Sequence, residues 1–219
     1  MAVLDPQDLL HLELPSLEKK YNEFCKTFYI KGKPELKGSL PIRLFDSLIL
    51  RTFGLILGSG KQLPDLKSEY KRLSGNFKRI GKLAKLLGHM GPLGRWILKL
   101  NFRTSASVLV RQGVCGIKTR ADHIEAARDY FGLCDLLGFD MEICKRDGDK
   151  IEFKVLECPV GYVKGDDVKV CLATMEFDSQ CIQKLGGRSI IKAVIPEGVP
   201  ACIIQIVPMG SNVSARAGH

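Results

Sequence analysis

In the first half of the chain, apolar residues recur every three or four positions, which is the spacing of an amphipathic helix. Leu66, Phe77 and Leu87 belong to one such series, with lysines and arginines lying outside the apolar stripe. Two glycines, Gly75 and Gly81, interrupt this helix and weaken it by about 1 kcal/mol each relative to alanine. The pattern predicts helices over about 15–29, 41–57, 66–87 and 95–111.

The pattern changes at Thr119. A helix is expected from about Arg120 to Leu137, and apolar and polar residues then alternate on both sides of Asp147-Gly148-Asp149, which predicts a β-hairpin. A further helix is expected over about 168–185. It is followed by a second hairpin, with strands at 189–195 and 201–207 around the loop 196–200.

Helices followed by helix, hairpin, helix and hairpin predict an α+β fold, because strands in hairpins with segregated helices do not build a doubly wound sheet. We expect a helical N-terminal region over 1–104, an α+β ligand-binding domain over 105–208 and a flexible tail over 209–219.

The composition is that of a globular protein. With 219 residues, 45% of them hydrophobic, the chain can bury a core without disulfides or metals. The first residues lack the pattern of a secretory leader, so we expect a cytoplasmic protein with reduced thiols. Charged residues interrupt the most apolar run, Leu40 to Leu57. We therefore expect a buried helix there and no transmembrane segment.

The net charge of +9 is concentrated between Lys61 and Arg103, where only two acidic residues occur. Such a run can bind nucleic acid, an anionic membrane surface or an acidic ligand, or it can form a solvated helix face. The nearby aromatic residues fall on or next to the apolar stripe, which argues against a specific nucleic-acid site. The internal glycines argue against stable membrane binding, so a transient contact with an anionic surface stays open.

Three cysteines fall where predicted elements begin or end. Cys158 ends a strand, Cys171 begins a helix and Cys202 begins the last strand, so their side chains can converge. They can act as metal ligands, as catalytic thiols, or simply as small buried side chains. Cys181 lies about 280° around the helix from Cys171, so we interpret it as structural.

Carboxylates near these cysteines are candidates for a general base. Asp178 follows Cys171 by about two helical turns and shares its face, and Glu157 precedes Cys158. Glu197 is a third candidate, while the Asp166-Asp167 pair is expected to cap the following helix. Among the histidines, His123 is the better candidate, although no two are spaced as metal ligands on one helix.

The residues from Gly138 to Pro159 resemble the hairpin of the 4-vinyl reductase and TRAPP-like ligand-binding domains. Cys158-Pro159, Cys171, Asp178 and the segment from Gly198 to Cys202 resemble more closely the pattern of the L-2-amino-thiazoline-4-carboxylic acid hydrolase family. The resemblance covers about residues 105–207.

This resemblance implies a compact domain with an antiparallel sheet and a pocket for a small molecule. It implies a hydrolase that opens a small ring, with Cys158, Glu157 and Asp178 as the expected catalytic residues. The alternative is a non-catalytic module that binds, senses or carries a hydrophobic ligand. The cofactor is left open, with zinc held by Cys158, Cys171 and Cys202 as the metal to be tested. A small-molecule ligand is the expected partner, and a homodimer is an open alternative.

Overall fold

The computed structural model describes residues 36–56, 66–113, 122–136, 139, 141–147 and 149–210. The fold is a mixture of helices and one antiparallel sheet, so the predicted α+β class is confirmed. The helix predicted over 15–29 lies outside the described residues. The elements, in chain order, are α3 (Leu40–Ile56), α4 (Leu66–His89), α5 (Pro92–Gln112), α6 (His123–Leu136), β1 (Met141–Asp147), β2 (Lys150–Val155), α7 (Val168–Thr174), α8 (Glu176–Leu185), β3 (Gly187–Ala193) and β4 (Cys202–Pro208).

The sheet joins the two predicted hairpins side by side. Its strand order is β1-β2-β4-β3, and each strand pairs antiparallel with its neighbours. Along β2 the buried residues Ile151, Phe153 and Val155 alternate with half-buried polar ones, as the period of two requires. The 3₁₀ turn Ile195–Glu197 connects β3 to β4 and ends at Gly198, whose φ of 87° favours glycine.

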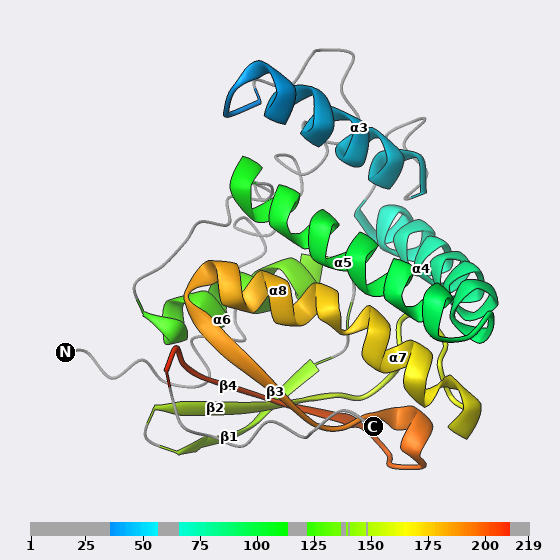
Figure 1. Ribbon diagram of the computed structural model, residues 1–219. Helices are drawn as coiled ribbons and strands as arrows, with labels where there is room; N and C mark the ends of the chain where they lie inside the picture. The colour runs from blue at the N-terminus through cyan, green and yellow to red at the C-terminus, as the bar shows by residue number, and fades with distance from the viewer. Residues whose placement is uncertain are drawn as a thin grey trace.

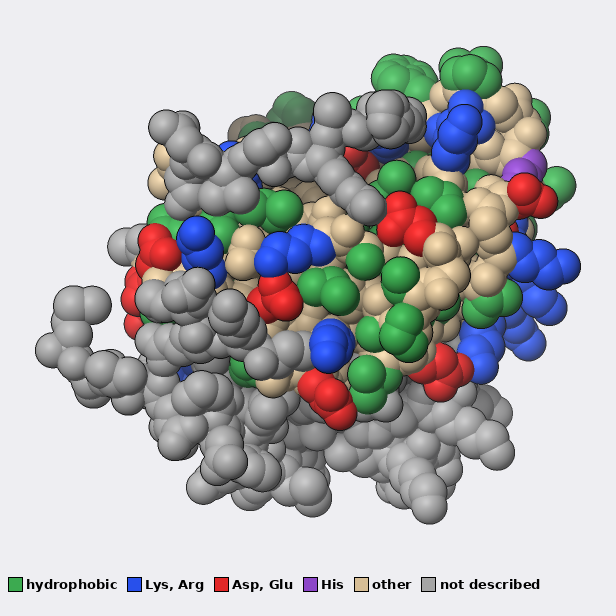
Figure 2. Space-filling model, turned by 90° about the horizontal axis from the view of Figure 1, so that it is seen from below, with side chains coloured by type: hydrophobic (Ala, Val, Ile, Leu, Met, Phe, Trp, Pro, Cys, Tyr) green, Lys and Arg blue, Asp and Glu red, His purple; other side chains and the backbone are tan. Residues whose placement is uncertain are grey.

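The helices form layers over one face of this sheet (Figure 1). α6 and α8 lie directly on the strands, α5 packs on α8, and α4 packs on both α5 and α7. Buried residues from α4, α5, α6, α7 and α8 share one core cluster with the sheet. Seen from below, the described residues on the opposite side of the sheet mix charged and hydrophobic side chains (Figure 2).

The helix predicted over 168–185 is divided at Met175 into α7 and α8. The Thr174 hydroxyl donates a hydrogen bond to the Cys171 carbonyl (2.8 Å), inside the last turn of α7. Threonine hydroxyls that bond to the preceding turn bend helices. No glycine or proline marks the position, which is why the sequence pattern predicts one helix.

The expectation that α3 is a buried helix is wrong for several of its side chains. Leu44 and Leu48 are exposed, because the described contacts of α3 are mainly with α5 on one side. Asp46 is fully buried and forms an ion pair with Arg111 near the end of α5. This pair attaches α3 to α5. The domain boundary expected between residues 104 and 105 falls inside α5.

The apolar stripe expected along α4 holds for Phe77, which is buried, but not for Leu83, which is 63% exposed. Two glycines form much of the buried face instead. A Cβ at Gly81 would lie 1.9 Å from the Val160 carbonyl oxygen, and one at Gly88 would lie 2.6 Å from Val170 Cγ2. These glycines let α4 approach the chain after β2 and α7 closely.

This packing predicts opposite effects for two glycine substitutions in the same helix. Gly81→Ala should destabilise the protein by about 1–3 kcal/mol, because the methyl group collides with backbone. Gly75→Ala should stabilise it by up to about 1 kcal/mol, because nothing lies within 4 Å of its Cβ and alanine favours the helix. Urea unfolding of both variants tests this, and equal effects would contradict the described packing of α4.

Candidate functional site

Three cysteines predicted to converge come from three separate elements. Cys158 lies in the turn after β2, Cys171 lies in α7, and Cys202 opens β4 opposite Val155 of β2. All three are buried and free. Cys202 and Cys158 each contribute to raising the pKa of Cys171, so the three sulfurs lie within electrostatic range of one another.

Burial controls the protonation of these thiols. It raises the pKa of Cys171 and, less strongly, that of Cys202, where a hydrogen bond from the Ile195 amide (3.3 Å) opposes the effect. Cys158 Sγ accepts a hydrogen bond from the Tyr162 amide (3.2 Å). Cys171 and Cys202 are therefore neutral thiols at pH 7, and neutral thiols are poor nucleophiles.

Asp178 is the acidic group of this cluster. Tyr130 of α6 donates a hydrogen bond to Asp178 Oδ1 of α8 (2.8 Å). Burial raises the pKa of Asp178 to about 6, against the opposing effect of the Tyr130 hydroxyl. The Asp178 carboxylate in turn contributes to the raised pKa of Cys171, Cys181 and Cys202. The expected placement of Asp178 near Cys171 thus exists, although the helix between them is interrupted.

Of the other predicted residues, Glu197 lies near Cys202, whereas Glu157 and His123 have partners elsewhere. Glu157 has a side chain that is 76% exposed and pairs with Lys78 of α4 at 3.7 Å, so the structure does not bring it to the thiols. Glu197 accepts a hydrogen bond from the Val194 amide (3.2 Å) and contributes to the raised pKa of Cys202. His123 contacts the Asp149 carbonyl and lies 3.3 Å from Asp122. Cys181 is fully buried, consistent with a structural role.

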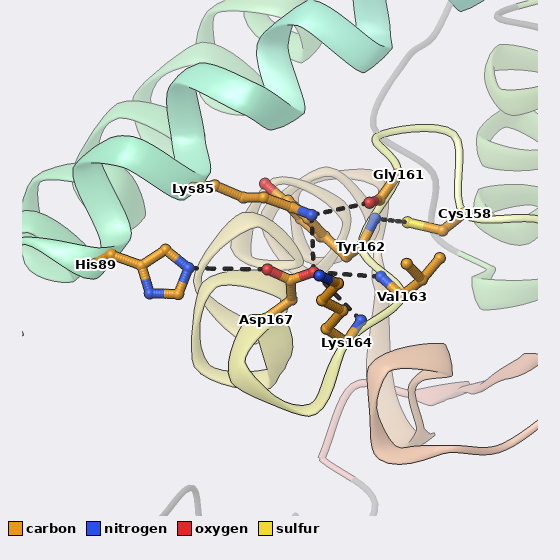
Figure 3. A network of polar contacts seen from close by, with 8 residues as sticks. All are labelled: Lys85, His89, Cys158, Gly161, Tyr162, Val163, Lys164 and Asp167. Atoms are coloured by element: carbon orange, nitrogen blue, oxygen red, sulfur yellow. Dashed lines mark hydrogen bonds and ion pairs between the residues drawn. The ribbon is translucent and has the colours of Figure 1, made fainter.

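A second polar cluster, not predicted from the sequence, lies beside Cys158 (Figure 3). Asp167 is 3% exposed, and its Oδ2 lies 2.8 Å from Lys85 Nζ of α4. Lys85 also donates a hydrogen bond to the Gly161 carbonyl (3.0 Å), and His89 Nε2 lies 3.8 Å from Asp167 Oδ1. Because Lys85 and Asp167 are far apart in the sequence, no local spacing indicates this pair.

The expected helix cap at Asp166-Asp167 is corrected by this geometry. The Asp167 carboxylate makes no capping hydrogen bond to α7 but accepts bonds from the amides of Val163 and Lys164, at 3.3 Å each. Burial alone would raise the pKa of Asp167, yet Lys85 and the two amides outweigh it and lower the pKa. Asp167 therefore holds the 161–167 segment against α4 as an anion.

Tyr162 lies between the two clusters. Its ring faces Lys85 Nζ at 5.5 Å, and its hydroxyl oxygen is a buried side-chain polar atom without a hydrogen-bond partner among the described residues. Burial raises the pKa of Tyr162, and the nearby Thr174 hydroxyl opposes that shift. The Thr174 hydroxyl donates its own hydrogen bond to the Cys171 carbonyl. The phenol is thus a neutral donor enclosed by protein.

A metal centre receives no support from the described part of the chain. Within it, no group of three or more histidine, cysteine, aspartate and glutamate side chains is arranged so that it could hold a metal ion. This includes Cys158, Cys171 and Cys202, the set expected to bind zinc.

Comparison with known proteins identified no relative of this chain. No family model matches the chain, and neither the curated proteins nor the solved structures contain a match. The resemblance to the thiazoline hydrolase and 4-vinyl reductase groups therefore remains a prediction from the sequence.

The raised pKa of Asp178 predicts a pH-dependent penalty on folding. Because the folded pKa of about 6 exceeds the ordinary value of 3.8, the unfolded chain ionises Asp178 first as the pH rises. The free energy of unfolding should lose up to about 3 kcal/mol from this group between pH 4 and pH 7. Asp178→Asn keeps the acceptor for Tyr130 and removes the penalty. The variant should therefore gain stability relative to wild type over that range in urea unfolding, and a constant difference would contradict the assignment.

The ion pair between Lys85 and Asp167 predicts a coupled effect of two substitutions. Lys85→Met leaves a buried carboxylate unpaired and should cost about 3 kcal/mol of unfolding free energy. The double variant Lys85→Met/Asp167→Asn should be less destabilised than the sum of the single variants, by about 1 kcal/mol or more. Lys82→Met, one turn away on the exposed side of α4, is the matched control and should be near neutral. Additive effects of the first two would exclude a direct interaction.

Proposed function

We propose that this protein is a non-catalytic module that binds a small, mainly apolar molecule through a hydrogen bond from Tyr162. The observation that carries the proposal is the Tyr162 hydroxyl, which is buried and lacks a partner among the described residues. A buried hydroxyl without a partner costs about 1–3 kcal/mol. An oxygen acceptor on a ligand would remove this cost, which gives the site a preference for carbonyl-like groups.

The surroundings of Tyr162 favour an apolar ligand body. The sulfurs of Cys158 and Cys171 both lie within electrostatic range of the Tyr162 phenol, and Cys171 is a neutral thiol. Neutral thiols are small, polarisable and weakly hydrated, which suits contact with an apolar molecule. The alternative predicted from the sequence, a 4-vinyl-reductase-like binding module, agrees with this proposal. Cys134, Cys158, Cys171, Cys181 and Cys202 are free, as a reducing cytoplasm would keep them, and cytoplasmic location stays a prediction.

One observation favours the hydrolase hypothesis as a second candidate. A carboxyl group with a pKa of about 6 can act as a general base near neutral pH, and Asp178 is such a group next to the thiols. In this version Asp178 would take a proton from water during opening of a thiazoline ring, with the thiols lining the site. Asp178→Asn should then abolish turnover of 2-amino-thiazoline-4-carboxylate while the fold persists. Absence of turnover in the wild-type protein would remove this candidate.

The binding proposal is tested with pairs of small molecules that differ only in whether they carry a hydrogen-bond acceptor. Acetophenone and ethylbenzene form one such pair, and the ketone should bind at least about tenfold more tightly, which is 1.4 kcal/mol. Tyr162→Phe should abolish this preference without lowering the stability of the free protein, since it removes an unpaired hydroxyl. Binding is measured by ligand-observed NMR and thermal shift.

Tyr130→Phe serves as the matched control, because that buried tyrosine already donates to Asp178. It should lower stability yet keep the preference for the ketone. The proposal fails if neither compound binds, or if Tyr162→Phe and the wild-type protein discriminate equally.

A further inference from the structure

The outer sides of α4 and α5 expose large apolar residues at helical spacing. We call this surface the α4–α5 apolar face; its members are Leu83, Leu86, Met90, Leu93, Trp96, Ile97 and Leu100. Their exposed fractions run from 40% for Ile97 to 71% for Leu86 and Met90. Single exposed apolar residues are normal on protein surfaces, but a contiguous group of this size marks a contact surface.

The two halves of this face lie on the same side of the helix pair. α4 and α5 pack against each other and join through a short turn at Gly91. Near that turn a Cβ at Gly94 would lie 1.9 Å from the Leu87 carbonyl oxygen, and Arg95 reaches the Gly88 carbonyl at 3.4 Å. Leu87 and Gly94 therefore face each other. By helical geometry the exposed apolar residues lie roughly 40–100° around from this contact on α4 and roughly 60–160° around on α5, displaced in the same sense within each helix.

The charges on the two helices of the face are almost all positive. α5 contains no aspartate or glutamate, and α4 contains only Glu69. Arg79 and Lys82 are exposed beside Leu83 and Leu86. Neither cation forms an ion pair with another of the described residues. Beside the α5 residues, Lys99 and Arg103 pair with Glu176 at 3.8 and 2.7 Å, with the Arg103 side chain still 57% exposed.

We propose that the α4–α5 apolar face docks in the plane of an anionic phospholipid bilayer. Apolar residues enter the boundary between headgroups and acyl chains, and the flanking cations contact lipid phosphates. Trp96, 59% exposed at the centre of the α5 half, suits the interfacial position that tryptophan prefers. None of the helices in the described residues is long and apolar enough to cross a bilayer, so the contact lies on one leaflet.

An anionic surface fits this face better than a second copy of the chain. A twofold dimer through the face would set the positively charged surface that carries Arg79 and Lys82 against the same positively charged surface of the other copy, with no acidic residue on α5 to compensate. Like charges brought together at an interface oppose association. A bilayer containing phosphatidylglycerol or phosphatidylserine supplies both the apolar phase and the negative charge.

The single tryptophan of the chain makes the proposal directly measurable. Vesicles of phosphatidylcholine with about 30% phosphatidylglycerol should shift Trp96 emission to the blue and carry the full-length protein into the pellet on sedimentation. Pure phosphatidylcholine vesicles should bind at least tenfold more weakly. Raising the salt concentration should weaken binding to the anionic vesicles.

Two double variants separate the apolar and the ionic contributions. Leu86→Glu/Leu93→Glu should abolish sedimentation with anionic vesicles, and Arg79→Glu/Lys82→Glu should weaken it at least tenfold and flatten its salt dependence. All four side chains are exposed, so circular dichroism should report an unchanged fold. Met209→Glu and Lys184→Glu, exposed positions outside this face, are the matched controls and should bind like wild type.

Three results would overturn the proposal. One is absence of binding to anionic vesicles, and another is unchanged binding of Leu86→Glu/Leu93→Glu. The third is a blue shift of Trp96 that depends on protein concentration without lipid and accompanies a dimer in analytical ultracentrifugation, which would assign the face to a second copy.

Discussion

The ion pair between Lys85 and Asp167 is the interaction on which the arrangement of this fold depends. It joins the C-terminal part of α4 to the segment between β2 and α7, two parts of the chain that no local sequence pattern brings together. Close approach is possible because Gly81 and Gly88 present backbone to Val160 and Val170. The pair is only partly enclosed, since Lys85 keeps contact with solvent while Asp167 does not. The pair therefore fixes how α4 is aligned with this segment more than it adds net stability. With the segment held in this way, Tyr162 and Cys158 are placed next to Cys171.

The interior beyond this pair is governed by desolvation. Asp178, Tyr130 and the thiols of α7 and β4 all have pKa values shifted towards the neutral form, and burial is the largest cause in each case. A site of neutral donors around an unpaired phenol suits recognition of an uncharged acceptor more than attack by a thiolate. Among the described groups with a shifted pKa, Asp178 is the one that titrates near neutrality, so it would be the general base if the hydrolase hypothesis were correct.

The molecule thus has two regions of different chemistry, one in the interior and one on the surface. The interior around Tyr162 is enclosed and lies beside the Lys85–Asp167 ion pair, whereas the α4–α5 apolar face is open and rimmed by cations. Both use α4, one side of which carries Lys85 and the close-packed glycines while the other carries Leu83 and Leu86. A protein that rests on an anionic membrane through one side of α4 would hold its Tyr162 site just behind the contact. Apolar molecules partition into membranes, so the two proposed roles are compatible, although neither depends on the other.

The local pattern of residues determined the elements and the fold class. The period of two placed both hairpins within about two residues, and helical spacing located α4, α5 and α6, because these signals depend on neighbours in the sequence. The same reasoning put Cys158, Cys171 and Cys202 on segments that meet, although Cys171 lies in the middle of α7 and not at its start. It failed where distant segments decide the outcome. The break at Met175 and the roles of Asp167 and Glu157 depend on contacts with residues far along the chain or on a side-chain bond to the backbone. Tertiary packing alone decided that Leu83 faces outwards, that Gly81 forms a close backbone contact, and that the pKa values of Cys171 and Cys202 are raised, because burial and long-range ion pairs have no local signature.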